Sequence, residues 1–438
     1  MVSPNVELLQ QDLHPPLSRH EAAVESDRCY FCYDAPCVTA CPTGIDIPLF
    51  IRQISTGNPG GSARTIFNEN ILGGMCARVC PTETLCEQAC VRNAAEDNPV
   101  RIGELQRFAT DHQMATGRQP YRRAPDTGRR VAVVGAGPAG LACAHRLSLY
   151  GHHVDVYDAR PKAGGLNEYG IAAYKTVDDF AQREVEYILS IGGITIRHHQ
   201  VLGRDVRLEN LQRDYHAVFL GLGLAGVNEL RIEGDTLDGV VDAVAFIAAL
   251  RQAEDPAGLD AGSRVLVIGG GMTAIDAAVQ SRMLGADEVT LAYRRGIEHM
   301  KASRFEQDLA RVNGVVIRTG LQPLRVLGDE GRVTGVEFAC MSGDDGTWGP
   351  TGATVILPCD RVLKAIGQTF VSGVLDEEGG AALAMEQGRI RVDNERRTSD
   401  ERIWAGGDCV AGGEDLTVAA VQDGKLAAES IHSVLSKG

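Results

Sequence analysis

Apolar residues follow two different spacings along this chain, and the change of spacing divides it into two regions. Between Ile45 and Asn70 they recur at helical spacing, and Gly57–Gly60 interrupts them, which predicts two short helices. A further helix is expected over Ser18–Ser26, and another opens at Ile102. From Val131 onward, runs of consecutive apolar residues, typical of buried strands, alternate with helical patterns. The sequence therefore predicts a small helical region followed by an α/β region.

The first strand of the α/β region leads into a glycine-rich turn. Val131–Val134 is followed by Gly135-Ala136-Gly137-Pro138-Ala139-Gly140, which opens a helix, and the next strand ends at Asp158. A G-x-G-x-x-G motif alone is weak evidence, but this one lies between a strand and a helix with an acid at the expected distance. Gly135 would make the tight turn, Gly137 would let a pyrophosphate approach the backbone, and Gly140 would bring helix against strand. We expect Asp158 to bind the adenosine ribose.

A second fingerprint follows the strand Arg264–Ile268. It reads Gly269-Gly270-Gly271-Met272-Thr273-Ala274, with alanine in place of the third glycine, which is a tolerated variant. The strand after it ends in Arg294 and Arg295 rather than in an acid. Because an arginine at this place suits a 2′-phosphate, the second nucleotide is expected to be NAD(P)H, with NADPH favoured.

Two fingerprints in one chain predict a nested arrangement, in which the chain returns to complete the first domain. The return is visible at Ile403-Trp404-Ala405-Gly406-Gly407-Asp408, followed by an apolar helix from Thr417 to about Leu435. A carboxylate at the end of that strand can bond the ribityl chain of a flavin. Together with the nicotinamide site, Gly407 and Asp408 therefore predict FAD.

Eight of the twelve cysteines form two clusters in the helical region. The first has gaps of two, four and three residues from Cys29 to Cys41-Pro42, and the second has gaps of three, five and three from Cys76 to Cys90. The first run resembles the ferredoxin pattern C-x2-C-x2-C-x3-C-P. Zinc, the alternative, prefers two short Cys pairs far apart. Two [4Fe-4S] clusters are therefore expected, while the isolated Cys143, Cys340, Cys359 and Cys409 are expected in cores.

The predicted fold class is α/β, with an N-terminal α-helical iron–sulfur domain followed by two nested Rossmann-like domains. We expect the iron–sulfur domain at 1–116 and a basic, polar linker at 117–130. The FAD domain is expected to be discontinuous, at 131–261 and 363–438, with the NAD(P) domain inserted at 262–362.

Charge and hydropathy exclude some functions. Lys and Arg total 43 against 58 Asp and Glu, so the net charge is −15, which disfavours a nucleic-acid partner. No apolar run approaches the roughly 20 residues of a membrane span. We expect a cytoplasmic protein, where clustered cysteines are metal ligands more often than disulfides. The adjacent histidines His152-His153 and His198-His199 are expected at the surface.

Three segments carry a resemblance to a known family: CYFCYDAPCVTACPTGIDI, CARVCPTETLCEQAC and IGELQRF. With the nucleotide motifs, they make nearly the whole chain resemble the FAD and iron–sulfur part of dihydropyrimidine dehydrogenases, above all the separate subunit of the bacterial two-subunit form. The small subunit of glutamate synthase is a more distant relative.

The resemblance implies a ligand scheme that the spacing leaves open. Cys29, Cys32, Cys37 and Cys90 would hold one [4Fe-4S] cluster, and Cys41, Cys80, Cys86 and Gln106 the other, which leaves Cys76 spare. Glutamate synthase relatives tend to carry a glutamate at the position of Gln106, so this residue favours the pyrimidine branch.

The segment Gly164–Lys175 should lie near the flavin ring, with Gly165 and Leu166 as contacts and Glu168 and Lys175 as weak catalytic candidates. It departs from the Gly-x-Pro segment and arginine of many relatives.

With no general acid or nucleophile for a substrate of its own, the chain reads as an electron path from NAD(P)H through FAD to the clusters. The resemblance implies a separate catalytic subunit with FMN and iron–sulfur clusters, in a heterotetramer, that reduces uracil or thymine. The alternatives are a glutamate synthase small subunit, a stand-alone NADPH-dependent electron donor, or a scaffold with degenerate nucleotide sites, which the intact glycines disfavour.

Overall fold

The computed structural model describes residues 6–344, 347–375 and 383–437, which form two compact units. The larger unit comprises His14–Glu168, Asp179–Ala225 and the described residues from Phe370 onward. The smaller unit comprises the described residues up to Leu13, together with Tyr169–Asp178 and Gly226–Thr369. Each unit is described by itself below.

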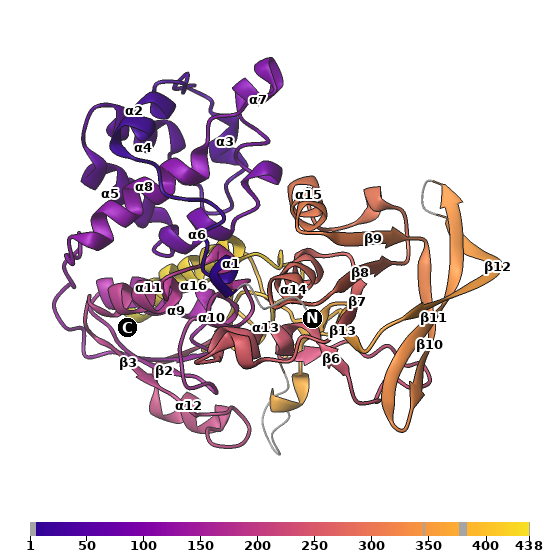
Figure 1. The fold of residues 1–438 in the computed structure, drawn as a ribbon. Helices are drawn as coiled ribbons and strands as arrows, with labels where there is room; N and C mark the ends of the chain where they lie inside the picture. The colour runs from indigo at the N-terminus through magenta and orange to yellow at the C-terminus, as the bar shows by residue number, and fades with distance from the viewer. Residues whose placement is uncertain (1–5, 345–346, 376–382, 438) are drawn as a thin grey trace. The chain divides into compact units, whose positions relative to one another are not determined.

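The N-terminal part of the larger unit is helical, as the spacing of apolar residues predicted (Figure 1). Ser18 caps the first of its helices, and Asn58 caps α5 directly after the predicted break at Gly57. Phe50, Ile51, Ile66 and Leu105 form its buried interior. The helices are α2 (Arg19–Ser26), α3 (Pro36–Thr39), α4 (Ile47–Ser55), α5 (Pro59–Glu69), α6 (Gly73–Val79), α7 (Val91–Glu96) and α8 (Ile102–Ala115).

A five-stranded parallel sheet forms the rest of the larger unit, with the strand order β17-β4-β1-β2-β3. The order reverses between β1 and β4, and such switch points are where open α/β sheets bind ligands. The strands are β1 (Arg130–Val134), β2 (His153–Tyr157), β3 (Ile194–Arg197), β4 (Ala217–Leu220) and β17 (Ile403–Ala405). The helices are α9 (Pro138–Leu149), α10 (Leu166–Tyr169), α11 (Phe180–Leu189), α12 (Leu208–Asp214) and α16 (Thr417–Lys437), and the short pair β15 (Met385–Glu386) and β16 (Arg389–Ile390) completes the unit.

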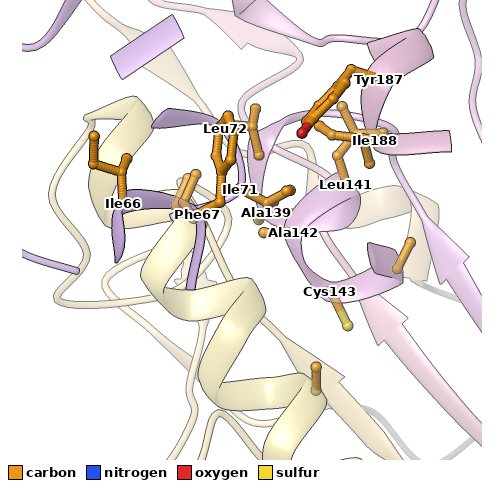
Figure 2. Close-up of a cluster of buried hydrophobic side chains, with 14 of the residues drawn as sticks. Ile66, Phe67, Ile71, Leu72, Ala139, Leu141, Ala142, Cys143, Tyr187 and Ile188 are labelled. Atoms are coloured by element: carbon orange, nitrogen blue, oxygen red, sulfur yellow. The ribbon is translucent and has the colours of Figure 1, made fainter. Parts of the chain in front are cut away.

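The helical part and the parallel sheet share one hydrophobic core. Figure 2 shows Phe67, Ile71 and Leu72 of the helical part gathered with Ala139 and Ala142 of α9. The ring of Phe67 also lies 5.5 Å from that of Tyr187 on α11, measured between centroids. The helical region is thus packed onto the sheet region rather than joined to it only through the segment 117–130.

The smaller unit contains a second five-stranded parallel sheet, with the order β6-β13-β7-β8-β9, and a three-stranded antiparallel sheet, β10-β11-β12. The parallel strands are β6 (Val240–Asp242), β7 (Arg264–Gly269), β8 (Glu288–Tyr293), β9 (Val315–Thr319) and β13 (Arg361–Ala365). The antiparallel ones are β10 (Leu321–Asp329), β11 (Arg332–Asp344) and β12 (Thr347–Pro358), and β5 (Gly226–Val227) pairs with β14 (Gln368–Thr369). The helices are α1 (Val6–Leu9), α13 (Ala243–Gln252), α14 (Met272–Met283) and α15 (Arg304–Val312).

The expected strands, turns and helices around both fingerprints are present, and Cys143, Cys359 and Cys409 are buried as expected, while Cys340 is half-buried. Three features differ from the sequence-based expectations. The smaller unit extends beyond the expected range 262–362, because β6 and the part of β13 after Val362 pair within its sheet.

The surface position expected for the paired histidines is wrong for His152, which is 1% exposed. Its ring bonds to Thr127 and to His432 at 2.8 and 3.0 Å, while His153 next to it is exposed. The antiparallel sheet was not expected at all. No helix among the described residues is long and apolar enough to cross a membrane.

Candidate functional site

Four of the predicted ligands line one cavity of the helical part. Cys29, Cys32, Cys37 and Cys90 surround it, together with Ile47, Pro48 and Ile51 from the start of α4. Burial raises the pKa of the Cys37 thiol to about 12, and the nearby thiols of Cys29 and Cys90 add to the effect. Cys90 thus lies beside three cysteines that are distant from it in the sequence.

Cys41, Cys80 and Cys86 form a second group. A hydrogen bond with Cys76 raises the pKa of Cys80 most, followed by burial and by the neighbouring thiols of Cys86 and Cys41. Burial, Glu87 and then Cys41 raise the pKa of Cys86. The thiol of Cys37 also contributes to the raised pKa of Cys86, so the first set of cysteines lies near the second.

Exposure separates Cys76 from the predicted ligands. All seven predicted cysteine ligands are partly exposed, whereas Cys76 is only 2% exposed. The Cys76 thiol forms a hydrogen bond with Cys80, which lies one helical turn further along the chain. Within the described residues, no three His, Cys, Asp or Glu side chains converge closely enough to hold a single metal ion.

Gln106 is fixed against the start of α6. It lies on α8, is 8% exposed, and donates through Nε2 to the carbonyl oxygen of Gly73 at 2.7 Å. Gly73 begins α6, the helix that ends before Cys80. This bond uses the NH2 group of the Gln106 amide. The side-chain oxygen, which is the atom that could bind iron, takes no part in it.

The first glycine fingerprint is built around the switch point of its sheet. Gly135 has φ of 101°, and a Cβ there would lie 2.1 Å from the carbonyl oxygen of Gly221, which follows β4. A Cβ on Gly140 would lie 1.9 Å from the oxygen of Gly135. Gly137, the N-cap of α9, is different, because the nearest atom to its Cβ would be the Cα of Gly165 at 3.8 Å. Two glycines thus allow close packing, and one leaves the approach to the helix N-terminus open.

The other predicted flavin contacts lie around this turn. Gly165 approaches Gly137 and Pro138, and Gly407 approaches Ala139. Leu166 begins α10 directly after Gly165. The carboxylate of Asp158 accepts from the backbone N–H of Ala136 at 2.6 Å. Burial, and to a lesser extent the negative charge of Asp415, raises the pKa of Asp408 to about 6. These residues form a cradle for a dinucleotide, which is the fit expected for FAD.

In the second fingerprint, too, some glycines allow close packing and one leaves the approach to the helix N-terminus open. A Cβ on Gly269, where φ is 150°, would lie 2.2 Å from the carbonyl oxygen of Ala365, and one on Gly270 would lie 2.5 Å from the ring of Tyr293. A Cβ on Gly271 would meet no atom within 4 Å. Met272 and Thr273 then begin α14, whose N-terminus faces this open space. Arg294 and Arg295 follow β8 and are exposed.

The two weak catalytic candidates are both held by other side chains. Glu168 is 2% exposed and accepts from Gln182 at 2.9 Å. Lys175 pairs with Asp276 and Glu306 at 2.7 and 2.6 Å. Burial alone lowers the pKa of Lys175, but the two carboxylates outweigh it and raise the pKa. The ammonium of Lys175 is thus engaged in a buried ion cluster of the smaller unit.

Sequence reasoning missed two buried charges of the sheet region that contact the helical part. Glu184 of α11 accepts from the backbone N–H of Met75 at 2.9 Å, and burial raises its pKa to about 8. Lys425 of α16 reaches Thr43 and Glu69. A signal was present in each helix, because Glu184 lies on the apolar face between Phe180 and Ile188, and Lys425 lies among small apolar residues.

The paired Rossmann-type sheets, the two glycine cradles and the cysteine-lined cavity define a class, the NAD(P)H-dependent flavin and iron–sulfur oxidoreductases. Residues 129–424 match the pyridine nucleotide-disulphide oxidoreductase family, and residues 7–118 match the family described as dihydropyrimidine dehydrogenase domain II, 4Fe-4S cluster. The chain belongs to the pyridine nucleotide-disulphide oxidoreductases and carries an N-terminal 4Fe-4S domain.

Two relatives match along almost their whole length. The glutamate synthase [NADPH] small chain of Escherichia coli K12 is 35% identical, over 97% of this chain and 93% of that protein. The NAD-dependent dihydropyrimidine dehydrogenase subunit PreT of the same strain is also 35% identical, over 97% of each chain. Both are subunits by name.

Solved structures show the same fold for the nucleotide-binding part. FprA of Mycobacterium tuberculosis in complex with NADPH is similar with a TM-score of 0.59 and 18% identity, over 72% of this chain and 85% of FprA. Thioredoxin reductase of T. acidophilum is similar with a TM-score of 0.56 and 21% identity, over 71% of this chain and all of that one.

Proposed function

We propose that this chain is the electron-input subunit of a dihydropyrimidine dehydrogenase. It would oxidise NAD(P)H, with NADPH favoured by Arg294 and Arg295, and deliver electrons to a separate catalytic subunit that reduces uracil or thymine. When bound, FAD accepts a hydride from the nicotinamide and the clusters carry electrons onward singly. The chain's own residues bind these groups, orient them and exclude water.

Two [4Fe-4S] clusters belong to this proposal. Cys29, Cys32, Cys37 and Cys90 would hold the first, and the cavity that these four residues line supports the set. Cys41, Cys80, Cys86 and Gln106 would hold the second. The buried position of Cys76 supports its exclusion.

The observation that carries the choice of the pyrimidine branch is the placement of Gln106. Its amide is held at the start of the helix that leads to Cys80, as a neutral fourth ligand of the second cluster would be. By resemblance, glutamate synthase relatives tend to place a carboxylate at this position.

A partner surface is supported by exposed apolar side chains around the first cavity. Tyr30 and Val91 line the cavity and are still 53% and 40% exposed, and Tyr33 and Leu49 next to it are exposed as well. Exposed aromatic and apolar groups gathered at one place are typical of protein interfaces. A catalytic subunit that docks there, in a heterotetramer, would receive electrons from the first cluster.

Anaerobic titration of the purified chain with NADPH and NADH tests the nucleotide part of the proposal. We expect NADPH to bleach the flavin spectrum and then the broad absorption of the clusters. Addition of uracil and an FMN-containing catalytic subunit should restore the oxidised spectrum and form dihydrouracil. If neither nucleotide bleaches a flavin, the proposal is wrong.

A glutamate synthase small subunit is the second candidate, because that relative is as similar as the pyrimidine one. Here the reduced chain would be reoxidised by a large glutaminase-containing subunit with glutamine and 2-oxoglutarate, and glutamate would form. Reoxidation by that subunit but not with uracil would select this candidate.

A further inference from the structure

Lys425 is a buried cation that the nucleotide and cysteine motifs do not explain. It lies near the middle of α16, the helix that follows the flavin segment Gly407-Asp408. Its exposed fraction is 8%. Lysine is rarely buried unless it is paired. A lysine at this place must therefore have partners, and both of them lie in the iron–sulfur part.

The first partner is the turn that carries Cys41. The Nζ of Lys425 donates to the carbonyl oxygen of Thr43 at 3.1 Å. The hydroxyl of the same threonine lies 3.3 Å from the sulfur of Cys41. Two short contacts thus connect the ammonium to a sulfur that the proposed function assigns to the second cluster.

The second partner is the end of α5. Lys425 pairs with Glu69 at 2.7 Å, and Glu69 is 42% exposed at its side chain, so water weakens its compensation of the charge. The turn after Glu69 leads to Gly73, which bonds the amide of Gln106. Lys425 therefore contacts two chain segments near the proposed second cluster: the turn that carries Cys41, and the end of α5, which leads to the Gly73 partner of Gln106.

We propose that Lys425 is a positioning residue that fixes the second cluster against the flavin-binding part and raises its reduction potential. The inference rests on the proposed function, because it needs the second cluster. One-electron reduction adds one negative charge to a cluster, and a fixed cation in a poorly solvated place stabilises that charge. In the proposed function that electron would come from the flavin, so Lys425 would favour transfer in the forward direction.

Four variants of the full chain test the inference: Lys425→Met, Lys425→Arg, Glu69→Gln and, as the matched control on the same helix, the exposed Lys437→Met. The measurements are iron content, flavin bleaching by NADPH, and the midpoint potential of each cluster by redox titration with electron paramagnetic resonance. Lys425→Met should lower the ratio of reduced to oxidised second cluster at a fixed potential by about tenfold, which is 59 mV for one electron. Lys425→Arg should restore most of it, and Lys437→Met should change nothing.

Glu69→Gln separates an electrostatic role from a merely structural one. Removal of the carboxylate leaves the cation less compensated, so the potential should rise, opposite to the effect of Lys425→Met. Shifts in the same direction in both variants, or an unchanged potential in Lys425→Met, would overturn the inference while the proposed function stands. Loss of about four irons in Lys425→Met, with flavin bleaching by NADPH kept and iron restored in Lys425→Arg, would support it. A wild-type chain with a single cluster would overturn both.

Discussion

Replacement of Lys175 by methionine should destabilise the smaller unit strongly. Lys175 is 8% exposed, and its ammonium lies 2.7 Å from Asp276 and 2.6 Å from Glu306, which are 3% and 7% exposed. Asp276 also accepts from the hydroxyl of Tyr174 at 3.2 Å. Methionine keeps the length of the side chain and removes the charge, so two carboxylates would be left facing each other in a buried place.

The size of the loss follows from the cost of an unpaired buried charge. Removal of one partner from a buried ion pair costs about 3–5 kcal/mol. Because Lys175 serves two carboxylates, we expect the upper half of that range, about 4 kcal/mol. The pKa of Lys175 is raised, so its contribution is present at neutral pH and is lost only as the pH rises through that raised value.

The loss in Lys175→Met should also depend on pH. Without the ammonium, the carboxylates of Asp276 and Glu306 repel each other at neutral pH, and acid relieves this repulsion. The deficit relative to wild type should therefore shrink as the pH falls below neutral.

Urea unfolding followed by hydrogen-exchange mass spectrometry measures this loss, because peptides of Gly226–Thr369 report on the smaller unit separately. The matched control is Lys301→Met, since Lys301 is exposed in the same unit. A loss below about 1 kcal/mol, the value for an exposed pair, would refute the reasoning. A loss that is the same at pH 5 and pH 8 would refute it too.

Three further predictions concern the second nucleotide site, the clusters and the buried Glu184. Gly271→Ala should fold normally and weaken NADPH binding at least tenfold, because the new methyl group meets no protein atom within 4 Å but fills the approach to the helix N-terminus. Gly269→Ala should instead lower the melting temperature, because its Cβ would lie 2.2 Å from a carbonyl oxygen. Cys76→Ser should keep about eight irons per chain and Cys90→Ser should lose a cluster, as measured by iron analysis. Glu184→Gln should flatten the pH dependence of stability between 4.5 and about 8. Burial raises the pKa of Glu184 to about 8, so the folded chain keeps a proton there that the unfolded chain loses above 4.5, and stability falls by roughly 4 kcal/mol as the pH rises through this window.

Controls and contrary outcomes differ among these three. Equal effects of Gly271→Ala and Gly269→Ala on the melting temperature would contradict the division of roles between the glycines. Equal loss of iron in the two cysteine variants would contradict the ligand scheme. Glu186→Gln on the same helix is exposed and should leave the pH dependence unchanged. A wild-type profile that is flat from pH 5 to 8 would show that Glu184 is not held protonated.

Most of the correct predictions came from local sequence signals, such as helix caps and glycine turns. Ser18 begins a helix because its side chain accepts from the N–H of Glu21, and both residues stand within one turn of sequence. Gly135 and Gly269 were recognised because a strand, a tight turn and a helix follow one another without interruption. Such signals need only neighbours along the chain.

Contacts between distant segments escaped prediction. The sequence offered no sign that β6 would pair with β13, more than a hundred residues later. The range expected for the inserted domain, 262–362, therefore left β6 out. The apolar faces around Lys425 and Glu184 suggested burial, but the sequence did not indicate their partners, which are 382 and 109 residues away. His152 was expected at the surface because nothing near it in sequence indicates His432.

The sequence by itself determined the chemistry of this protein: two nucleotide cradles, a set of thiols and an acidic chain without a membrane-length apolar run. The tertiary structure decided that Cys90 lines one cavity with Cys29, Cys32 and Cys37, and that Cys76 is buried. It also decided that the iron–sulfur part shares its core with the flavin-binding sheet, through residues such as Phe67 and Ala139 (Figure 2). The physical reason is that turns and helix starts depend on the conformations of a few consecutive residues, whereas burial and charge pairing depend on which segments meet when the whole chain has folded.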